Sequence, residues 1–211
     1  MVEFQDQLKE SLKKLRETAK ERKFDQTTDL IINLQKYSIK KNPINLFVTL
    51  PHKVKDKKIA GFLEAESPLI DTILPNEFKK YGNKKKLKSL VKKYDFFIAQ
   101  SSIMPKVATA FGRVLGPAGK MPSPQLGIIL NADQKTIEDL KQKIDTSIKL
   151  RVKESSVKVP VGKSSMPNKE ISENILTVYH ELLKNLPRDK ENIKNVEIKF
   201  TMSKPIKIRV R

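Results

Sequence analysis

The chain has 211 residues, of which 38% are hydrophobic and 32% charged, enough for one large or two modest domains with apolar cores. Its formal net charge of +19, contributed by every part of the chain, favours polyanionic partners, nucleic acid before an acidic membrane surface. The lack of cysteine excludes disulfides, thiolate metal sites and a cysteine nucleophile, and the two histidines are far apart in sequence.

The first 57 residues predict one helix followed by two strands. Residues 3–22 form an amphipathic pattern, in which apolar side chains recur every three or four positions: Phe4, Leu8, Leu12, Leu15 and Ala19. Alternating residues over 28–34 predict a strand, and a second strand is expected at 45–50, where Pro51 ends it. The charged run 52–58 then interrupts the pattern and marks a domain boundary.

The middle of the chain, residues 58–145, alternates strands with helices, which is typical of a small open α/β sheet. The expected elements are a strand at 59–63, a basic helix at 84–93, an apolar strand at 94–99, and helices at 101–111 and 132–144. We expect Ser101 or Ser102 to cap the helix at 101–111, with Pro105 in its first turn.

From residue 146 the strand-rich pattern of the first 57 residues returns. Strands are expected at 147–152, 157–161, 196–200 and 206–210, with an amphipathic helix over 168–186. The two chain ends therefore predict one α+β host domain, residues 1–57 plus 146–211, with a Rossmann-like α/β domain, residues 58–145, inserted into it. Two chain crossings would join the domains and permit a hinge.

The segment Gly112–Pro124 combines three glycines and three prolines, which predicts a shaped loop rather than a helix. Its cations Arg113 and Lys120, together with exposed glycine amides, favour contact with an anion. A nucleotide-binding P-loop is excluded, because Val114 stands where the first glycine is required and Met121 where the magnesium-binding hydroxyl is required.

Four ordered segments resemble the universal large-subunit ribosomal protein L-one family: Lys23–Asp29, Gly112–Pro124, Val161–Ser164 and Thr201–Pro205. The strand Tyr94–Gln100 is similar to archaeal members. The resemblance covers nearly the whole chain. It implies a two-domain α/β protein that is a structural constituent of the large ribosomal subunit. Such a protein binds the stalk region of the rRNA and forms the mobile stalk involved in release of tRNA from the exit site.

The resemblance also implies which residues contact RNA. In the host domain these are Phe24, Thr27, Thr201, Met202 and Ser203, and Lys163 is a further candidate because the adjacent Gly162 and the strand end would hold its position. Secondary contacts are expected from the insert: Arg113, Gly116, Gly119 and Lys120. The chain departs from the family at Ser203, where glycine is usual, and at Ala118, where arginine is common.

Other functions remain as alternatives. The same surface could bind the protein's own mRNA and repress its translation, or the charge could serve only non-specific nucleic-acid binding. An enzyme is not expected, since no catalytic carboxylate pair or hydroxyl–base set accompanies the Gly112–Pro124 segment. No apolar run approaches the roughly 20 residues of a membrane span, and residues 1–20 alternate acids and bases too densely for a signal peptide. We expect a cytoplasmic, ribosomal protein without metal or cofactor, monomeric away from the ribosome.

Overall fold

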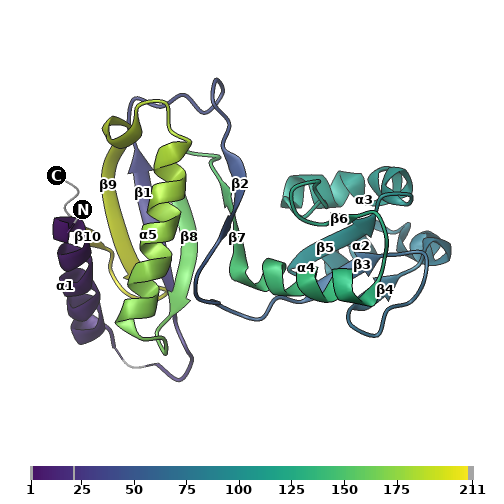
Figure 1. Ribbon diagram of the computed structural model, residues 1–211, viewed down its shortest axis with the longest axis horizontal. Coiled ribbons are helices and arrows are strands. Elements are labelled where there is room, and N and C mark those ends of the chain that lie inside the picture. Colours follow the sequence, from purple (N-terminus) through teal and green to yellow (C-terminus); the bar gives the residue numbers. More distant parts are fainter. Residues whose placement is uncertain (1, 21, 209–211) are drawn as a thin grey trace. The chain divides into compact units, whose positions relative to one another are not determined.

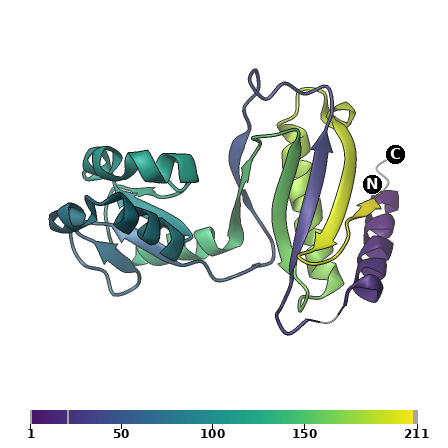
Figure 2. The same ribbon diagram turned by 180° about the vertical axis from the view of Figure 1, so that it is seen from behind.

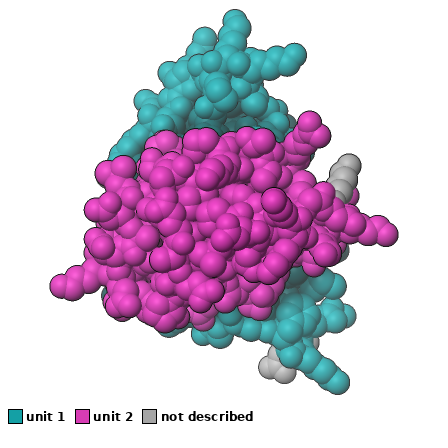
Figure 3. Space-filling model, turned by 90° about the vertical axis from the view of Figure 1, so that its right-hand side faces the viewer, with its two compact units in different colours: residues 1–55, 146–211 teal, residues 56–145 magenta. Residues whose placement is uncertain are grey.

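A computed structural model describes residues 2–20 and 22–208 (Figure 1). The chain forms two compact units, one built from Met1–Lys55 with Thr146–Arg211 and the other from Asp56–Asp145 (Figure 3). We call them the host unit and the insert. The expected mixed α/β fold is confirmed. The chain passes between the units after residues 55 and 145, compared with 57 and 145 in the sequence-based assignment.

The host unit is organised around a four-stranded antiparallel sheet in the order β10-β9-β1-β8. The strands are β1 (Thr27–Leu34), β8 (Ser156–Lys163), β9 (Ile193–Phe200) and β10 (Ile206–Ile208). Burial alternates strictly along β1, because its even-numbered residues face the core. The expected last strand ran to residue 210, and residues 209–210 lie outside the described part of the chain.

Two helices complete the host core. The long helix α5 (Asn168–Lys184) covers one face of the sheet, in front of it in Figure 1 and behind it in Figure 2. Helix α1 (Val2–Thr18) packs against α5, β9 and β10, and the Phe4 and Tyr179 rings stack with their centroids 4.8 Å apart. The helix ends at Thr18, earlier than the expected residue 22. A short helical turn, η2 (Asp189–Asn192), precedes β9.

The strands next to the two chain crossings pair with each other. β2 (Asn45–Thr49) and β7 (Ser147–Arg151) form an antiparallel two-stranded ribbon in which Thr49 lies opposite Ser147. Leu150 is fully buried and Val48 nearly so, so the ribbon is anchored in the host core. Both crossings therefore leave the host unit side by side.

The insert contains a parallel sheet in the order β4-β3-β5-β6, as expected of a Rossmann-like unit. Its strands are β3 (Ile59–Phe62), β4 (Asp71–Ile73), β5 (Phe96–Gln100) and β6 (Ile128–Ile129), and its helices are η1 (Pro75–Tyr81), α2 (Lys84–Lys93), α3 (Met104–Ala118) and α4 (Gln134–Thr146). The buried Phe62 ring lies 4.9 Å from the Phe111 ring and 5.6 Å from the Phe97 ring, measured between centroids, at the centre of the insert core.

The prediction of a loop over Gly112–Pro124 was wrong in its first half, because α3 continues to Ala118. Three apolar residues of α3, Val107, Phe111 and Leu115, are buried on one face of the helix. Each buried side chain of this size stabilises by about 1.5–3 kcal/mol, whereas a helical glycine costs only about 0.5–1 kcal/mol. Burial therefore outweighs the two helix-weakening glycines within α3.

The end of α3 explains why its proline is tolerated. Pro117 stands in the last turn, so the missing N–H removes a single bond near a helix end. Gly119 follows with φ of 72°, its N–H donates to the Gly116 carbonyl, and the Lys120 N–H donates to the Leu115 carbonyl. This pair of bonds is a Schellman motif.

The predicted serine cap of α3 was also wrong. The helix begins at Met104 after Ile103, and no side chain caps it. Ser102 instead donates to Glu64 Oε1 over 2.7 Å, while Pro105 does lie in the first turn. Across the described part of the chain, no helix is both long and apolar enough to cross a membrane.

Candidate nucleic-acid interface

Three strand ends of the host sheet meet at one edge and gather the host candidates. Thr27, the first residue of β1, lies opposite Lys163, the last residue of β8, and Thr28 lies opposite Phe200, the last residue of β9. The remaining candidates of the host unit directly precede β1 or follow β9: Phe24, Thr201, Met202 and Ser203. The antiparallel pairing thus brings all six together.

A tight turn after β9 presents two of these residues. The Ser203 N–H donates to the Phe200 carbonyl over 3.1 Å, which closes a β-turn with Thr201 and Met202 at its exposed tip. The Thr27 N–H donates to Thr201 Oγ1 over 3.1 Å, and the Thr201 N–H donates to the Thr27 carbonyl over 3.0 Å. The Thr201 hydroxyl, expected to face RNA, therefore ties the turn to β1.

Ser203 shows how this chain accommodates a residue other than glycine. Its hydroxyl oxygen accepts a 2.8 Å bond from the Phe200 N–H and lies 3.2 Å from the Lys204 carbonyl, to which it can donate. Its φ is not positive, since the described non-glycine residues with positive φ are Lys36 and Asp189. The serine side chain folds back onto the turn and needs no special backbone conformation.

Phe24 and Met202 are exposed apolar side chains at the same edge, with 54% and 61% of their surface accessible. The Met202 N–H donates over 3.2 Å to the side-chain oxygen of Gln26, a residue that is itself buried. The backbone of Met202 is thus held while its side chain is free to meet a partner. Among the described residues, only Leu130, in the insert, is also a large hydrophobic exposed to this degree.

Lys163 supplies a positive charge beside these apolar groups. Its ammonium nitrogen lies 3.7 Å from Asp25 Oδ2. Hydrogen bonds, chiefly from the Ser164 hydroxyl, lower the pKa of Asp25, so this carboxylate is ionised at neutral pH. The adjacent Gly162 is required by packing, because a Cβ there would come within 2.9 Å of Ile171 Cγ1.

The family described as "Ribosomal protein L1p/L10e family" matches residues 12–204. The chain belongs to this family. It is 33% identical over 209 residues to the large ribosomal subunit protein uL1 of Nanoarchaeum equitans, covering 94% of this chain and 98% of that protein. It is 36% identical to uL1 of Pyrobaculum arsenaticum (90% and 87% covered) and 33% identical to uL1 of Pyrococcus abyssi (95% and 94% covered). The L1p/L10e proteins are ribosomal proteins and not enzymes.

In this L1p/L10e protein the four insert candidates do not form one anion-binding loop. Arg113 and Gly116 are exposed on the surface of α3, and nothing lies within 4 Å of a Cβ placed at Gly116. Gly119 is used for its left-handed conformation. The Lys120 ammonium donates to the carbonyls of Val91 and Tyr94, at the end of α2. We therefore withdraw Lys120 as an RNA contact, because its charge already stabilises the end of a helix.

Sequence reasoning missed Asp25 and Gln26, which connect the two loops of the host edge. Asp25 accepts bonds from the 163–166 loop, and the Gln26 side chain holds the 200–203 turn. Both lie within the recognised motif at residues 23–29, yet their partners are 138 to 176 positions away along the chain. Nothing local in the sequence connects a residue to partners so distant.

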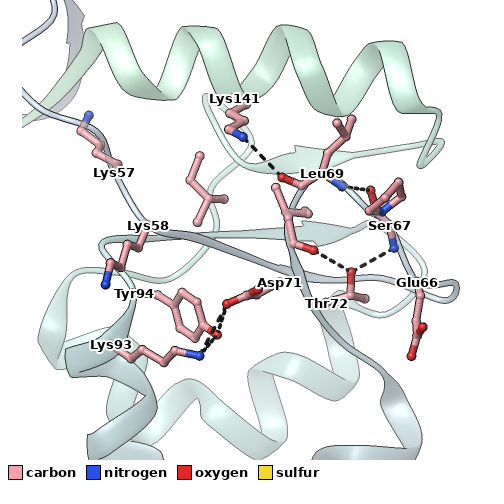
Figure 4. Close-up of a pocket in the computed structure, with 13 residues that line it drawn as sticks. Lys57, Lys58, Glu66, Ser67, Leu69, Asp71, Thr72, Lys93, Tyr94 and Lys141 are labelled. Carbon is pink, nitrogen blue, oxygen red and sulfur yellow. Dashed lines mark hydrogen bonds and ion pairs between the residues drawn. The ribbon is translucent and has the colours of Figure 1, made fainter.

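The insert contains a hollow of about 630 Å³ beside α2 and α4 (Figure 4). Two of its charged side chains are joined through a tyrosine: Lys93 donates to the Tyr94 hydroxyl over 2.7 Å, and this hydroxyl donates to Asp71 Oδ2 over 2.6 Å. Burial raises the pKa of Tyr94, so its hydroxyl keeps its proton. We assign no ligand to this hollow. Within the described residues, no cluster of three or more His, Cys, Asp or Glu side chains could hold a metal ion.

Proposed function

We propose that this protein is a structural component of the large ribosomal subunit and binds the stalk region of its rRNA through the β1–β8–β9 edge of the host unit. The carrying observation is the pair of exposed apolar side chains, Phe24 and Met202, on a hydrogen-bonded edge that also bears Lys163. A single exposed apolar side chain needs no explanation, but apolar side chains gathered among polar groups at one place are typical of an interaction site. Family membership and the charge of +19 support RNA as that partner.

Each group at the edge has a distinct task in this proposal. The Phe24 ring stacks on a base or lies against a ribose, and the flexible thioether of Met202 fills the neighbouring space. Lys163 pairs with a phosphate, and the Thr27 hydroxyl bonds a ribose 2′-OH, which distinguishes RNA from DNA. Arg113, Gly116 and Gly119 of the insert remain proposed secondary contacts, Gly119 through its backbone alone.

The same proposal covers movement and location. A component of the cytoplasmic ribosome that lines a mobile stalk must follow its RNA and the departing exit-site tRNA. The two crossings that leave the β2–β7 ribbon side by side support a hinge between the units. Away from the ribosome we expect a monomer. Solution scattering that is identical with and without RNA, also for a hinge-stiffened variant, would contradict the hinge.

The first test is a filter-binding titration of a stalk-rRNA fragment against a scrambled RNA of equal length over a salt series. We expect a preference of roughly 10³-fold or more that persists at physiological salt. Equal affinities that fall together with salt mean that only net charge acts, as in a non-specific basic protein. Duplex DNA as competitor separates the two readings. Binding to the protein's own mRNA would use the same surface, and the same variants would abolish it.

Single substitutions test whether the RNA binds at the host edge. Phe24→Ala should weaken binding to the stalk fragment by roughly 1–3 kcal/mol, the range for a lost stacking contact on an aromatic ring. Met202→Ala should weaken it in the same direction, because the thioether packs against the RNA. Both side chains are exposed, so thermal stability should change little. Leu130→Ala is the matched control, since Leu130 is 81% exposed but lies in the insert. Equal losses for all three variants would argue against the host edge.

A further inference from the structure

Two charged residues, Arg16 and Asp25, form hydrogen bonds with the loop that follows β8, and we call this pair of residues the bracket. The loop, Lys163–Met166, is itself a β-turn, in which the Met166 N–H donates to the Lys163 carbonyl over 3.1 Å. Arg16 of α1 donates to carbonyl groups of this loop, and Asp25, just before β1, accepts from its N–H and hydroxyl groups. Neither residue was a sequence-based candidate, and the proposed function assigns no task to either.

Arg16 holds the loop through its whole guanidinium group. Nη1 donates to the Ser164 carbonyl over 2.7 Å, Nη2 donates to the Met166 carbonyl, and Nε donates to the Asn168 side-chain oxygen. Three acceptors spread over five residues match the planar fork of arginine. A lysine has a single nitrogen at this place and cannot span them.

Asp25 holds the same loop with both carboxylate oxygens. Oδ1 accepts from the Ser164 hydroxyl over 2.8 Å and from the Ser165 N–H over 3.0 Å, and Oδ2 accepts from the Ser165 hydroxyl over 2.8 Å. Oδ2 also lies 3.7 Å from the ammonium nitrogen of Lys163. The carboxylate therefore aims the lysine as well as the loop.

Simple electrostatics disfavours this arrangement at an RNA-binding edge. An ionised carboxylate beside Lys163 repels phosphates and competes for the lysine that would pair with them. A carboxylate at this place favours binding only if the free energy gained by ordering the loop in advance exceeds the electrostatic cost of its negative charge. We infer that Asp25 and Arg16 are positioning residues of the RNA-binding edge, which pre-organise the Lys163–Met166 loop for phosphate contact. The inference rests on the proposed function.

The direction in which one substitution changes the affinity for RNA tests this inference. Asp25→Asn removes a negative charge, so electrostatics alone predicts tighter binding to the stalk-rRNA fragment. Loss of the bracket predicts weaker binding, by roughly tenfold, because bonds to a charged acceptor are lost. The salt dependence should also become shallower by about one phosphate contact. Arg16→Lys keeps the charge and should weaken binding in the same direction.

The matched control is Asp6→Asn. Asp6 also pairs with a lysine of the host unit, Lys9 at 3.6 Å, but stands near the other end of α1 from Arg16. It carries the same charge change and should bind the fragment as tightly as the wild type or slightly more tightly. Amide hydrogen exchange of Ser165 and Met166 in the free proteins reports on the loop itself. It should be faster in Asp25→Asn and Arg16→Lys, and unchanged in the control.

Several results would overturn the inference. Unchanged or tighter binding by Asp25→Asn would do so, as would unchanged exchange of the loop amides. The affinity of the variants could also fall only in proportion to the fraction of unfolded protein, while the salt dependence of binding stays unchanged. That result would show that both residues stabilise the fold and do not position the loop. A wild type without preference for the stalk fragment overturns the proposed function, and this inference with it. A wild-type preference for the stalk fragment, together with unchanged affinity of both substituted proteins for it, overturns the inference alone.

Discussion

The ammonium group of Lys120 donates a 2.7 Å hydrogen bond to the carbonyl oxygen of Val91, near the end of a neighbouring helix. A second bond of 2.8 Å reaches the Tyr94 carbonyl. The positive charge lies where the dipole of α2 ends, so it satisfies carbonyls that the helix leaves open and offsets their partial negative charge. The Schellman turn at Gly119 directs the chain to this place.

Lys120→Met should therefore destabilise the protein rather than weaken RNA binding. The lost bonds from a charged donor predict a decrease in the free energy of unfolding of about 1–3 kcal/mol. Urea denaturation would measure it, with Lys106→Met as the control because Lys106 is exposed on α3, the helix that precedes Lys120. A drop in affinity for the stalk-rRNA fragment at unchanged stability would restore Lys120 as an RNA contact.

Thr28→Val should stabilise the host unit. Thr28 is fully buried on β1, and within the described chain its Oγ1 has no hydrogen-bond partner. Valine has the same shape without the unsatisfied hydroxyl, so we expect a gain of about 1 kcal/mol in the free energy of unfolding. Thr49→Val, at an exposed position of β2, should change it by less than about 0.5 kcal/mol. Destabilisation by Thr28→Val would indicate a bond to a water or a partner.

The stability contributed by Asp25 should depend on pH in the acidic range. Hydrogen bonds from Ser164 and Ser165 and the charge of Lys163 lower its pKa below the ordinary 3.8. A carboxyl group with a lowered folded-state pKa stabilises fully above its unfolded pKa and loses this contribution as pH falls through the folded one. The stability difference between wild type and Asp25→Asn should thus be constant at neutral pH and shrink below about pH 4. A difference that grows on acidification would contradict this.

Lys86→Glu should raise the stability of the insert and lower the affinity of the protein for RNA. Helix α2 has no acidic residue in its first turn, where the helix dipole favours one, and Asn83 caps it through a 3.0 Å bond from the Lys85 N–H. A glutamate three positions after this cap should stabilise by about 0.5–1 kcal/mol. Binding to stalk and scrambled RNA should weaken alike at low salt. Lys86→Gln is the control for charge removal alone.

The elements of the fold were accessible from the sequence where the pattern is local. Leu30, Ile32 and Leu34 recur at every second position, as a strand requires, and β1 alternates in burial accordingly. Leu8, Leu12 and Leu15 recur at helical spacing and are buried in α1. The Gly112–Pro124 segment was misjudged, because counting its glycines and prolines ignored the burial of Phe111 and Leu115 that holds α3 together.

The sequence alone determined the basic character of the protein and the amphipathic helices in the two chain ends that form the host unit. Through four short motifs it also indicated the family. Periodicity and composition are local properties, so each can be read without knowing what a residue touches. Only the tertiary structure decided which loops meet at the host edge. Thr27 and Thr201 are 174 positions apart, and Asp25 and Ser165 are 140 apart. Such contacts depend on strand pairing across the whole chain. The same pairing sets Phe24 and Met202 at one edge. In the insert, the packing of α3 beside α2 places the Lys120 ammonium on the carbonyls of Val91 and Tyr94.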